Sequence, residues 1–419
     1  MNASLRFRLS AMTFLQFVVW GAWYGQLSKY LLAIGFTGSQ VGNVYAAFSV
    51  AMIASPFFVG MVADRFFRAE RVLGVLNLLG ALILYALAQI KTYDAFLWVM
   101  LLYCLTFTPT LALTNSISMR QMSDPAREFP PIRVMGTLAW IAVTNLIGFM
   151  GWGDKATIFY ASMATSIALA AFSFALPKTP PLASGPVSTG QIIGADAFSL
   201  FKDKSYRIFF IASVLVCIPL SFYYAFANPS ITDAYKASFL VANPGAALPD
   251  TFYVENKMSL GQASEVIFML LLPWAYRKMG IKNILLLGLA AWVARFLLFG
   301  FGNADGQEWM LYSAILLHGV CYDFFFVSGM IYTDQKAGES FKSSAQGLIS
   351  LATYGLGMLI GSLISGRVQQ YYSSPSGDSV VTHWNSVWLI PAAIAFAVSL
   401  LFVFFFKQEK PVIQESNSQ

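Results

Sequence analysis

The sequence predicts an all-α integral membrane protein with about twelve transmembrane helices in two six-helix halves. Of its 419 residues, 57% are hydrophobic and only 11% are charged, whereas soluble domains carry roughly 25% charged residues. Twelve apolar stretches reach the length of about 20 residues that a helix needs to cross a bilayer. A polar linker divides these stretches into six and six.

The expected spans follow one another with short polar connections. They run over residues 9–33, 41–63, 72–91, 95–119, 131–152, 157–177, 207–231, 256–276, 282–301, 308–332, 343–368 and 385–406. The first span follows Arg6 and Arg8, but it is too long and too aromatic for a signal peptide and has no small-residue cleavage site after it. We therefore interpret it as a membrane helix.

The longest connection on the side of the termini covers residues 178–206 and begins with a stretch rich in proline, serine and glycine. Such a composition is typical of a linker. We expect it to join an N-terminal half, residues 1–177, to a C-terminal half, residues 207–407. Residues 408–419 are expected to form a cytoplasmic tail.

On the opposite side the longest predicted connection covers residues 232–255, with a turn at residues 243–245. The segments at residues 60–68 and 273–280, which follow the second and eighth spans, resemble each other weakly. This internal repeat supports two related halves, an architecture in which secondary transporters bind substrate at the membrane midplane.

Lysine and arginine predict the orientation. Most of the 26 basic residues flank the side of the termini. The other side has only Lys29, Lys91, Lys155, Lys236, Lys257 and Arg367. Because basic loops stay inside, both termini are expected in the cytoplasm, which agrees with an even number of spans. The net charge of +6 reflects these clusters, so no nucleic acid is expected as a partner.

Motifs of enzymes and of metal sites are absent from the sequence. It has no phosphate-binding GxxxxGK[ST] loop, no HExxH, no CxxC and no GxSxG. The three cysteines lie in apolar stretches, where buried thiols are expected. We therefore expect neither an enzyme nor an ATP-driven pump, and no cofactor or metal.

Acidic residues inside the expected spans are the first candidates for function. Asp323 lies in the middle of an apolar stretch, where an ionised carboxylate costs at least about 2.5–3.5 kcal/mol. Glu265 is a second intramembrane acid, three residues after Gln262 and so on the same helical face. The alternative is that these residues only hydrogen-bond between helices.

Three further spans add polar and aromatic candidates. Arg133, Thr137 and Trp140 share one face of the fifth span, although Arg133 is close enough to its end to reach the membrane surface instead. The remaining candidates are Ser221 and Tyr224 on the seventh span and Tyr322 and Phe326 on the tenth. Rings beside acids and hydroxyls suit a flat, polyhydroxylated ligand such as a base or a sugar. With 37 phenylalanines, lipid-facing rings are the alternative.

Two more polar residues are expected to be structural. His318 lies five residues before Asp323, too far around the helix to share its face, and is expected to be packed. Arg295 is expected to be a structural ion-pair partner. The roles of both residues stay open at this point.

Motifs along nearly the whole chain resemble the nucleoside:proton symporters of the major facilitator superfamily. They are Phe14-Leu15-Gln16-Phe17 with Trp20-Gly21 and Trp23, Pro109-Thr110-Leu111 with Asn115, Phe129-Pro130-Pro131-Ile132-Arg133 with Gly136-Thr137, Asp196-Ala197-Phe198 with Leu200-Phe201-Lys202, Gln262 with Ser264-Glu265, Gly280-Ile281-Lys282-Asn283, Arg295-Phe296, Asp323-Phe324-Phe325 and Ser344-Ala345-Gln346-Gly347. Their order and spacing are more specific than any single motif.

The resemblance implies proton-coupled uptake of a nucleoside, such as uridine or adenosine, by a monomer in a bacterial cytoplasmic membrane. The binding residues of the family correspond to Arg133, Thr137, Gln262, Glu265, Tyr322, Asp323 and Phe326, with Trp140 at an aromatic position. Ser221 and Tyr224 stand where the family has amide side chains, which leaves the preference for purine or pyrimidine bases open.

These expectations give a working hypothesis. Asp323 and Glu265 bind the ribose hydroxyls, Gln262 adds hydrogen bonds, the aromatic rings stack on the base, and one of the two acids takes the coupling proton. The alternative within the same class is a proton symporter for a sugar or another small polar solute. A sensor without flux is disfavoured, because no sizeable output domain follows the last span.

Overall fold

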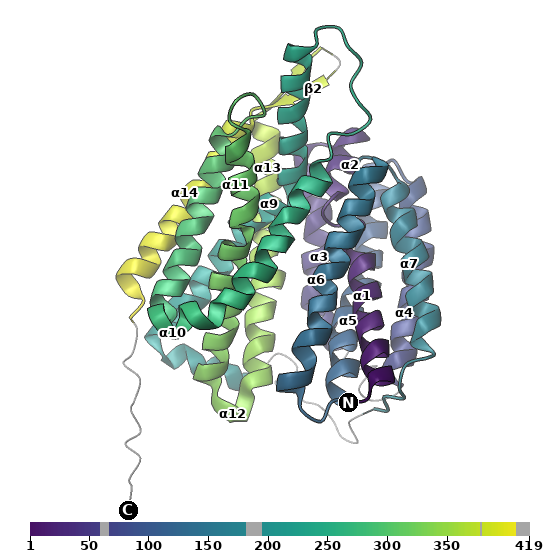
Figure 1. The fold of residues 1–419 in the computed structure, drawn as a ribbon, viewed down its shortest axis with the longest axis vertical. Helices are drawn as coiled ribbons and strands as arrows, with labels where there is room; N and C mark the ends of the chain where they lie inside the picture. Colours follow the sequence, from purple (N-terminus) through teal and green to yellow (C-terminus); the bar gives the residue numbers. More distant parts are fainter. Residues whose placement is uncertain (59–66, 182–194, 378, 408–419) are drawn as a thin grey trace, which may run out of the picture.

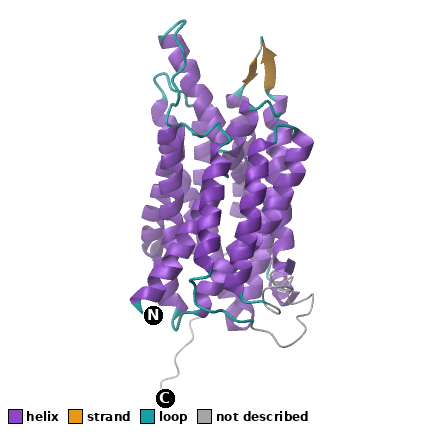
Figure 2. Ribbon diagram, turned by 90° about the vertical axis from the view of Figure 1, so that its right-hand side faces the viewer, coloured by secondary structure: helices purple, strands orange, loops and turns teal. Residues whose placement is uncertain are grey.

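Helices run roughly parallel to one long axis of the molecule (Figures 1 and 2). The computed structural model describes residues 1–58, 67–181, 195–377 and 379–407. We call the end at which α1 begins and α14 ends the terminal end, and the opposite end, which carries α2 and a short β-hairpin, the distal end (Figure 1).

The N-terminal half contains seven helices in the part of the chain that the structure describes. They are α1 (Ala3–Gly21), α2 (Leu27–Ala33), α3 (Gly38–Phe58), α4 (Ala69–Gln89), α5 (Tyr93–Arg120), α6 (Pro125–Met150) and α7 (Thr157–Ser173).

The C-terminal half is built from longer helices, two of which pass through π-helical segments. Its elements are the 3₁₀ helix η2 (Ala195–Lys202), α9 (Lys204–Ala242), α10 (Val254–Phe301), α11 (Glu308–Tyr322), the π-helix η3 (Asp323–Val327), α12 (Ser328–Ser350), the π-helix η4 (Leu351–Gly357), α13 (Met358–Tyr371), β1 (Ser373–Ser376), β2 (Ser379–Thr382) and α14 (Trp384–Phe405). The two strands pair antiparallel at the distal end, with Ser373 opposite Thr382.

Long helical stretches account for the twelve predicted crossings. Eight helices among the described residues are long and apolar enough to span a membrane. The 48 residues of α10 are two crossings, because Gly280 (φ 71°, ψ 166°) turns the chain between them. Three further helices, α1, α3 and α7, are shorter or less apolar than these eight. With them the bundle has the twelve expected passes.

Most predicted spans agree with the observed helices to within a few residues, but two do not. The first predicted span, residues 9–33, is interrupted by a turn between the end of α1 at Gly21 and the start of α2 at Leu27. The helix of the seventh span continues past its predicted end. The prediction ended it at residue 231, whereas α9 continues to Ala242. Apolar composition marks where a helix leaves the membrane and not where it ends. Here the polar extension is held by neighbours, because Asp233 accepts a hydrogen bond of 2.9 Å from the indole of Trp384. The predicted turn lies in the shortened connection, where Gly245 has a φ of 80°.

Some predicted segments fall largely outside the described residues. These are the middle of the linker (182–194), the tail (408–419) and most of the repeat segment at residues 60–68. The end of the linker forms η2 directly before α9.

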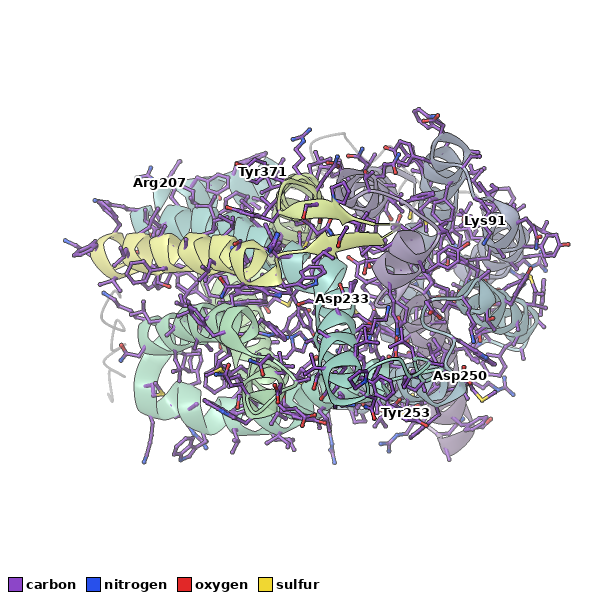
Figure 3. All side chains as sticks on the ribbon, turned by 90° about the horizontal axis from the view of Figure 1, so that it is seen from above. Lys91, Arg207, Asp233, Asp250, Tyr253 and Tyr371 are labelled. Carbon is purple, nitrogen blue, oxygen red and sulfur yellow. The ribbon has the colours of Figure 1, made fainter. Side chains whose placement is uncertain are left out.

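The two halves lie side by side, with blue and purple helices on one side and green and yellow helices on the other (Figures 1 and 3). Within the halves, α1 packs on α6 and α7, and α10 packs on α11 and α14. Between the halves, α3 packs on α13 and α6 packs on α10. These two contacts are the most extensive ones between the halves.

Glycines allow the close approach of the halves at the distal end. A Cβ on Gly42 would overlap the carbonyl oxygen of Ser362, and one on Gly366 would lie 2.5 Å from the carbonyl oxygen of Gly38. In the second contact, Asn256 donates to the carbonyl oxygen (3.0 Å) and to the side-chain oxygen (2.8 Å) of Asn145. The distal end is therefore closed by direct contact of the halves.

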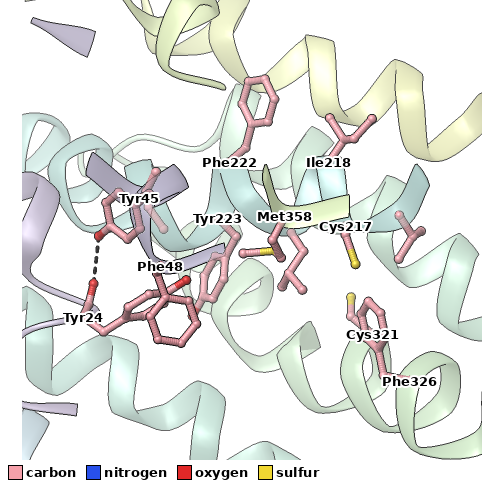
Figure 4. Packing of buried hydrophobic residues seen from close by; sticks show 14 of the residues in the cluster. Tyr24, Tyr45, Phe48, Cys217, Ile218, Phe222, Tyr223, Cys321, Phe326 and Met358 are labelled. Carbon is pink, nitrogen blue, oxygen red and sulfur yellow. Dashed lines mark hydrogen bonds between the residues drawn. The ribbon is translucent and has the colours of Figure 1, made fainter. Parts of the chain in front are cut away.

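Aromatic residues fill the space between the halves closer to the centre. The hydroxyl of Tyr45 donates to the carbonyl oxygen of Tyr24 at 2.8 Å (Figure 4). It also contacts the carbonyl oxygen of Tyr224 at 3.3 Å, so α3 ties the turn after α1 to α9. The bundle thus encloses its centre from the distal side.

Candidate functional site

A cavity of about 730 Å³, including space open to solvent, lies between the halves. It is lined by Phe17, Trp20, Tyr24, Phe48, Arg133, Gly136, Thr137, Trp140, Tyr224, Gln262, Glu265, His318, Tyr322, Tyr354 and Met358. Both halves contribute side chains, as expected of a site between two repeats.

Seven of the ten predicted site residues line this central cavity. They are Arg133, Thr137, Trp140, Tyr224, Gln262, Glu265 and Tyr322. The helical spacing used for α6 and α10 therefore identified the inward-facing sides of both helices.

On the N-terminal side, α6 presents a cation beside an aromatic wall. The guanidinium carbon of Arg133 lies 4.6 Å from the centroid of the Phe17 ring, within cation–π range. A Cβ on Gly136 would come within 2.9 Å of both side chains, so the glycine permits this contact. Arg133 is exposed and lies about two turns from the terminal start of α6. The cavity thus extends toward the terminal end.

Five rings form a compact aromatic wall. Trp20 stacks on Phe48 with centroids 5.5 Å apart and meets the edge of Trp140 at 5.3 Å. Tyr24 meets Tyr224 at 5.4 Å across the interface of the halves. These rings come from α1, the turn after it, α3, α6 and α9, so a flat ligand can contact rings of both halves at once.

On the C-terminal side, α10 and α11 present polar groups. Glu265 is 16% exposed, and its Oε2 lies 4.0 Å from Nε2 of His318. The two helices pack closely there, because a Cβ on Gly319 would lie 2.6 Å from the backbone of Ser264. The hydroxyl of Tyr322, the residue directly before η3, hydrogen-bonds to the hydroxyl of Tyr354, which lies within η4. π-Helical segments of this kind occur frequently at functional sites.

Three predicted site residues do not line the central cavity. Ser221 is buried and donates to the carbonyl oxygen of Cys217 at 2.9 Å. Phe326 packs against Tyr322 and Phe325, and Figure 4 places it beside Cys321. Asp323 is fully buried, and both carboxylate oxygens are without a hydrogen-bond partner among the described residues. Their assignment as substrate ligands stays a prediction.

The expectation of an ion pair for Arg295 was wrong within the described part of the chain. Its Nε donates to the carbonyl oxygen of Ala314 at 2.9 Å, NH1 lies 3.0 Å from Nδ1 of His318, and the guanidinium lies 3.7 Å from the centroid of Tyr223. A ring face and two acceptors take the place of a carboxylate. His318 is packed, as predicted, but it also lines the cavity.

The sequence prediction missed several lining residues as candidate ligands. Phe17, Trp20 and Tyr24 recur at steps of three and four residues along α1 and the turn that follows it, a spacing that could have shown their common face. No local signal identifies Phe48, Tyr354 and Met358, because they reach the cavity only through the packing of α3 against η4 and α13 across the interface.

A second, smaller cavity of about 380 Å³ lies next to the first on the distal side. Trp140, Tyr224 and Gln262 line both cavities and so separate them. Beyond them, Glu255 accepts hydrogen bonds from Lys29 at 2.7 Å and from Asn228 at 3.1 Å. Glu255 is 1% exposed. This distal cluster of Lys29, Asn228 and Glu255 joins α2 of one half to α9 and α10 of the other.

A twelve-helix bundle of two halves, with a polar and aromatic cavity at its centre, defines a secondary membrane transporter. The nucleoside H⁺ symporter family matches residues 1–411, and the chain belongs to this family. The resemblance stated from the sequence is thereby confirmed.

Known relatives agree in sequence and in fold. The chain is 38% identical over 413 residues to the putative nucleoside transporter YegT of Escherichia coli (96% of this chain, 93% of that protein). It is 33% identical over 414 residues to the xanthosine permease of Escherichia coli (96% of each). A crystal structure of the nucleoside transporter NupG, of a D323A mutant, matches with a TM-score of 0.87 and 30% identity (96% of this chain, 100% of that one).

Proposed function

We propose that the protein takes up a nucleoside together with a proton across the cytoplasmic membrane by alternating access. The observation that carries this proposal is the central cavity, which combines an aromatic wall with an acid and an amide in a chain of the nucleoside H⁺ symporter family. A nucleoside is a flat base joined to a sugar with several hydroxyls. The wall suits the base, and Gln262 and Glu265 suit the sugar.

Each side chain has a distinct role in this proposal. Trp140, Trp20 and Tyr224 contact the base. Gln262 and Glu265 hydrogen-bond the ribose hydroxyls. Arg133 and Thr137 line the opening toward the terminal end, where substrate leaves.

We propose different roles for the two acids. Glu265 faces the cavity, and in this proposal it binds the substrate. Asp323 is enclosed without a partner among the described residues, a setting in which an ionised carboxylate is costly and the neutral acid fits. In alternating access, a proton-binding site opens to one side of the membrane at a time, so it is closed off from both sides during part of the transport cycle. We therefore assign proton coupling to Asp323.

The positive-inside pattern supports a cytoplasmic location for the terminal end. The contacts of α3 with α13 and of α6 with α10, together with the distal cluster, then close the outer side. We therefore infer an inward-facing state. We also propose that the transporting unit is a monomer, a proposal supported by the central cavity, which one chain lines.

Transport in proteoliposomes tests the function. Purified protein is expected to accumulate labelled uridine under an inward proton gradient and to lose this accumulation when a protonophore collapses the gradient. Unlabelled nucleosides are expected to compete, and sugars are not. Competition by sugars without competition by nucleosides would establish the alternative, a proton symporter for another polar solute.

Two isosteric variants test the roles of the acids. Asp323→Asn is expected to exchange labelled for unlabelled uridine at near wild-type rates but to lose accumulation, because it cannot bind or release the proton. Glu265→Gln is expected to weaken uridine binding by about tenfold, which corresponds to one hydrogen bond to a charged group. Uphill uptake by Asp323→Asn would show that Asp323 is not the coupling site.

A further inference from the structure

His318 lies in the wall of the central cavity between a buried cation and an acid. Its Nδ1 is 3.0 Å from NH1 of Arg295, and its Nε2 is 4.0 Å from Oε2 of Glu265. The residue is 1% exposed, yet it lines the cavity. These two neighbours determine which hydrogen bonds the imidazole can make.

Arg295 determines the tautomer of His318. A guanidinium carries donors and no acceptor, so Nδ1 must accept the hydrogen bond from NH1. The proton of the neutral imidazole is then on Nε2. A doubly protonated ring would place two donors against each other at 3.0 Å, and a flipped ring would turn a C–H toward the guanidinium. The observed contact is consistent only with a neutral ring that donates from Nε2.

Arg295 lies on α10 and is itself held in place by contacts with α11 and α9. Its Nε donates to the carbonyl oxygen of Ala314, one helical turn before His318. Its guanidinium lies 3.7 Å from the centroid of the Tyr223 ring. Arg295 therefore bridges two successive turns of α11 and points Nε2 of His318 toward Glu265.

The distance between His318 and Glu265 fits a bridging hydroxyl. At 4.0 Å, Nε2 and Oε2 are too far apart for a direct hydrogen bond, whose donor–acceptor distance does not exceed about 3.5 Å. An oxygen about 2.8 Å from both atoms can accept from Nε2–H and donate its own proton to the carboxylate. A hydroxyl group is both an acceptor and a donor, as this position requires.

We propose that His318 is a substrate-binding residue, which Arg295 holds as the Nε2–H tautomer so that it donates to the ribose hydroxyl bound by Glu265. This inference rests on the proposed function and adds a binding residue to its site. Since Nδ1 is occupied by the guanidinium, His318 does not carry the coupling proton.

Two variants separate the hydrogen bond from packing. In His318→Gln the amide nitrogen reaches the place of Nε2, whereas the amide of His318→Asn reaches only the place of Nδ1. The dissociation constants of uridine and of its 2′-, 3′- and 5′-deoxy analogues are measured for full-length wild type and both variants.

His318→Asn is expected to weaken uridine binding by about tenfold, as a lost hydrogen bond does. It should leave unchanged the binding of the one deoxy analogue that lacks the bridging hydroxyl. His318→Gln should retain most of the uridine affinity. In both variants the accumulation that remains should still collapse when the proton gradient is removed. Each protein serves as its own control for folding, because the analogues are compared within one variant.

Equal weakening of uridine and all three analogues, or no weakening at all, would overturn the hydrogen bond to the sugar. Loss of accumulation with intact exchange in both variants would show that His318 carries the proton and would overturn the fixed tautomer. Failure of the wild type to bind any nucleoside would overturn the proposed function, and this inference with it.

A spectroscopic measurement tests the role of Arg295 as a positioning residue. The chain has two histidines, so ¹⁵N-labelled histidine gives two imidazole signals, and His383→Gln identifies the one from His318. The wild type is expected to show an unprotonated Nδ1 and a protonated Nε2. Arg295→Met should lose this tautomer. The same tautomer in both proteins would show that Arg295 does not set it.

Discussion

At the scale of single residues, Trp140 stands at the boundary of the two cavities. Its ring meets Trp20 at 5.3 Å and belongs to the lining of both cavities. A ring at this boundary can contact the base of a nucleoside and also separates the central cavity from the distal one.

Trp140→Ala is expected to raise the KM for uridine by about tenfold, because stacking of a base on an aromatic side chain contributes about 1–3 kcal/mol. Trp140→Phe keeps a ring and should stay near wild type. Trp98→Ala is the matched control, because Trp98 is 68% exposed on α5. Uptake kinetics in proteoliposomes provide the measurement. An unchanged KM in Trp140→Ala would exclude Trp140 from the substrate site.

Residues on a helix face were predictable from spacing, whereas their partners across helices were not. The three-residue step from Gln262 to Glu265 identified the cavity side of α10. The two contacts of His318 depend on Arg295 and Glu265, which lie 23 and 53 positions before it in the chain. No local pattern contains such distances, so the sequence left the roles of both His318 and Arg295 open.

At the scale of helices, the contact of α3 with α13 depends on small residues. Gly42→Ala places a Cβ against the backbone oxygen of Ser362, which cannot move without displacing α13. The variant is expected to keep its fold and lose most uptake, because the distal end no longer closes. Gly347→Ala is the control, since a Cβ there meets nothing within 4 Å. Wild-type uptake by Gly42→Ala would show that this close contact is not required.

The start of α9 offers a prediction for stability. Asp203 accepts hydrogen bonds from the backbone N–H groups of Ser205 (2.7 Å) and Tyr206 (3.2 Å) and forms an ion pair with Lys336. Partial burial alone would raise the pKa of Asp203, but Lys336 and the two N–H groups together hold this pKa below its usual value. The carboxylate therefore stabilises the fold above the unfolded pKa of about 3.9, and this contribution is lost as the pH falls further.

Asp203→Ala is expected to lower the free energy of unfolding by about 1 kcal/mol at neutral pH, as loss of a helix cap does. The difference from wild type should shrink below about pH 4, where the wild-type carboxylate is protonated as well. Melting temperatures in detergent at several pH values provide the measurement, with exposed Asp250→Ala as the control. A difference that is independent of pH would assign the effect to packing.

Helix positions were predicted well because bilayer thickness imposes a length on every apolar stretch. The extension of α9 to Ala242 was missed for the same reason, since hydropathy does not register a helix that continues outside the membrane. The π-helices at Asp323 and Leu351 have no counterpart in apolar periodicity. η3 packs on α10, whereas η4 packs on α9 and on α3 of the other half, and such neighbours appear only in the folded structure.

At the scale of the whole molecule, the sequence predicted two halves and a site between them, but not which end is closed. Lys29 counted in the sequence as a basic residue of an outer connection. In the structure it pairs with Glu255, 226 positions away, across the interface of the halves. Closure depends on such long-range pairs, and each of them becomes visible only when both halves are in place.

The distal cluster gives a test of closure in the whole molecule. Lys29→Glu places two carboxylates together at a site where Glu255 is 1% exposed. Breaking a buried pair of this kind costs about 3–5 kcal/mol. Since this cost applies only when the distal end is closed, the variant should favour the opposite state and lose uptake at least tenfold. The exchange Lys29→Glu with Glu255→Lys restores opposite charges and should recover uptake, as measured in proteoliposomes beside each single variant. If the double variant stays as inactive as Lys29→Glu alone, the charge pair does not hold the halves together, and closure rests on the glycine contacts of α3 and α13.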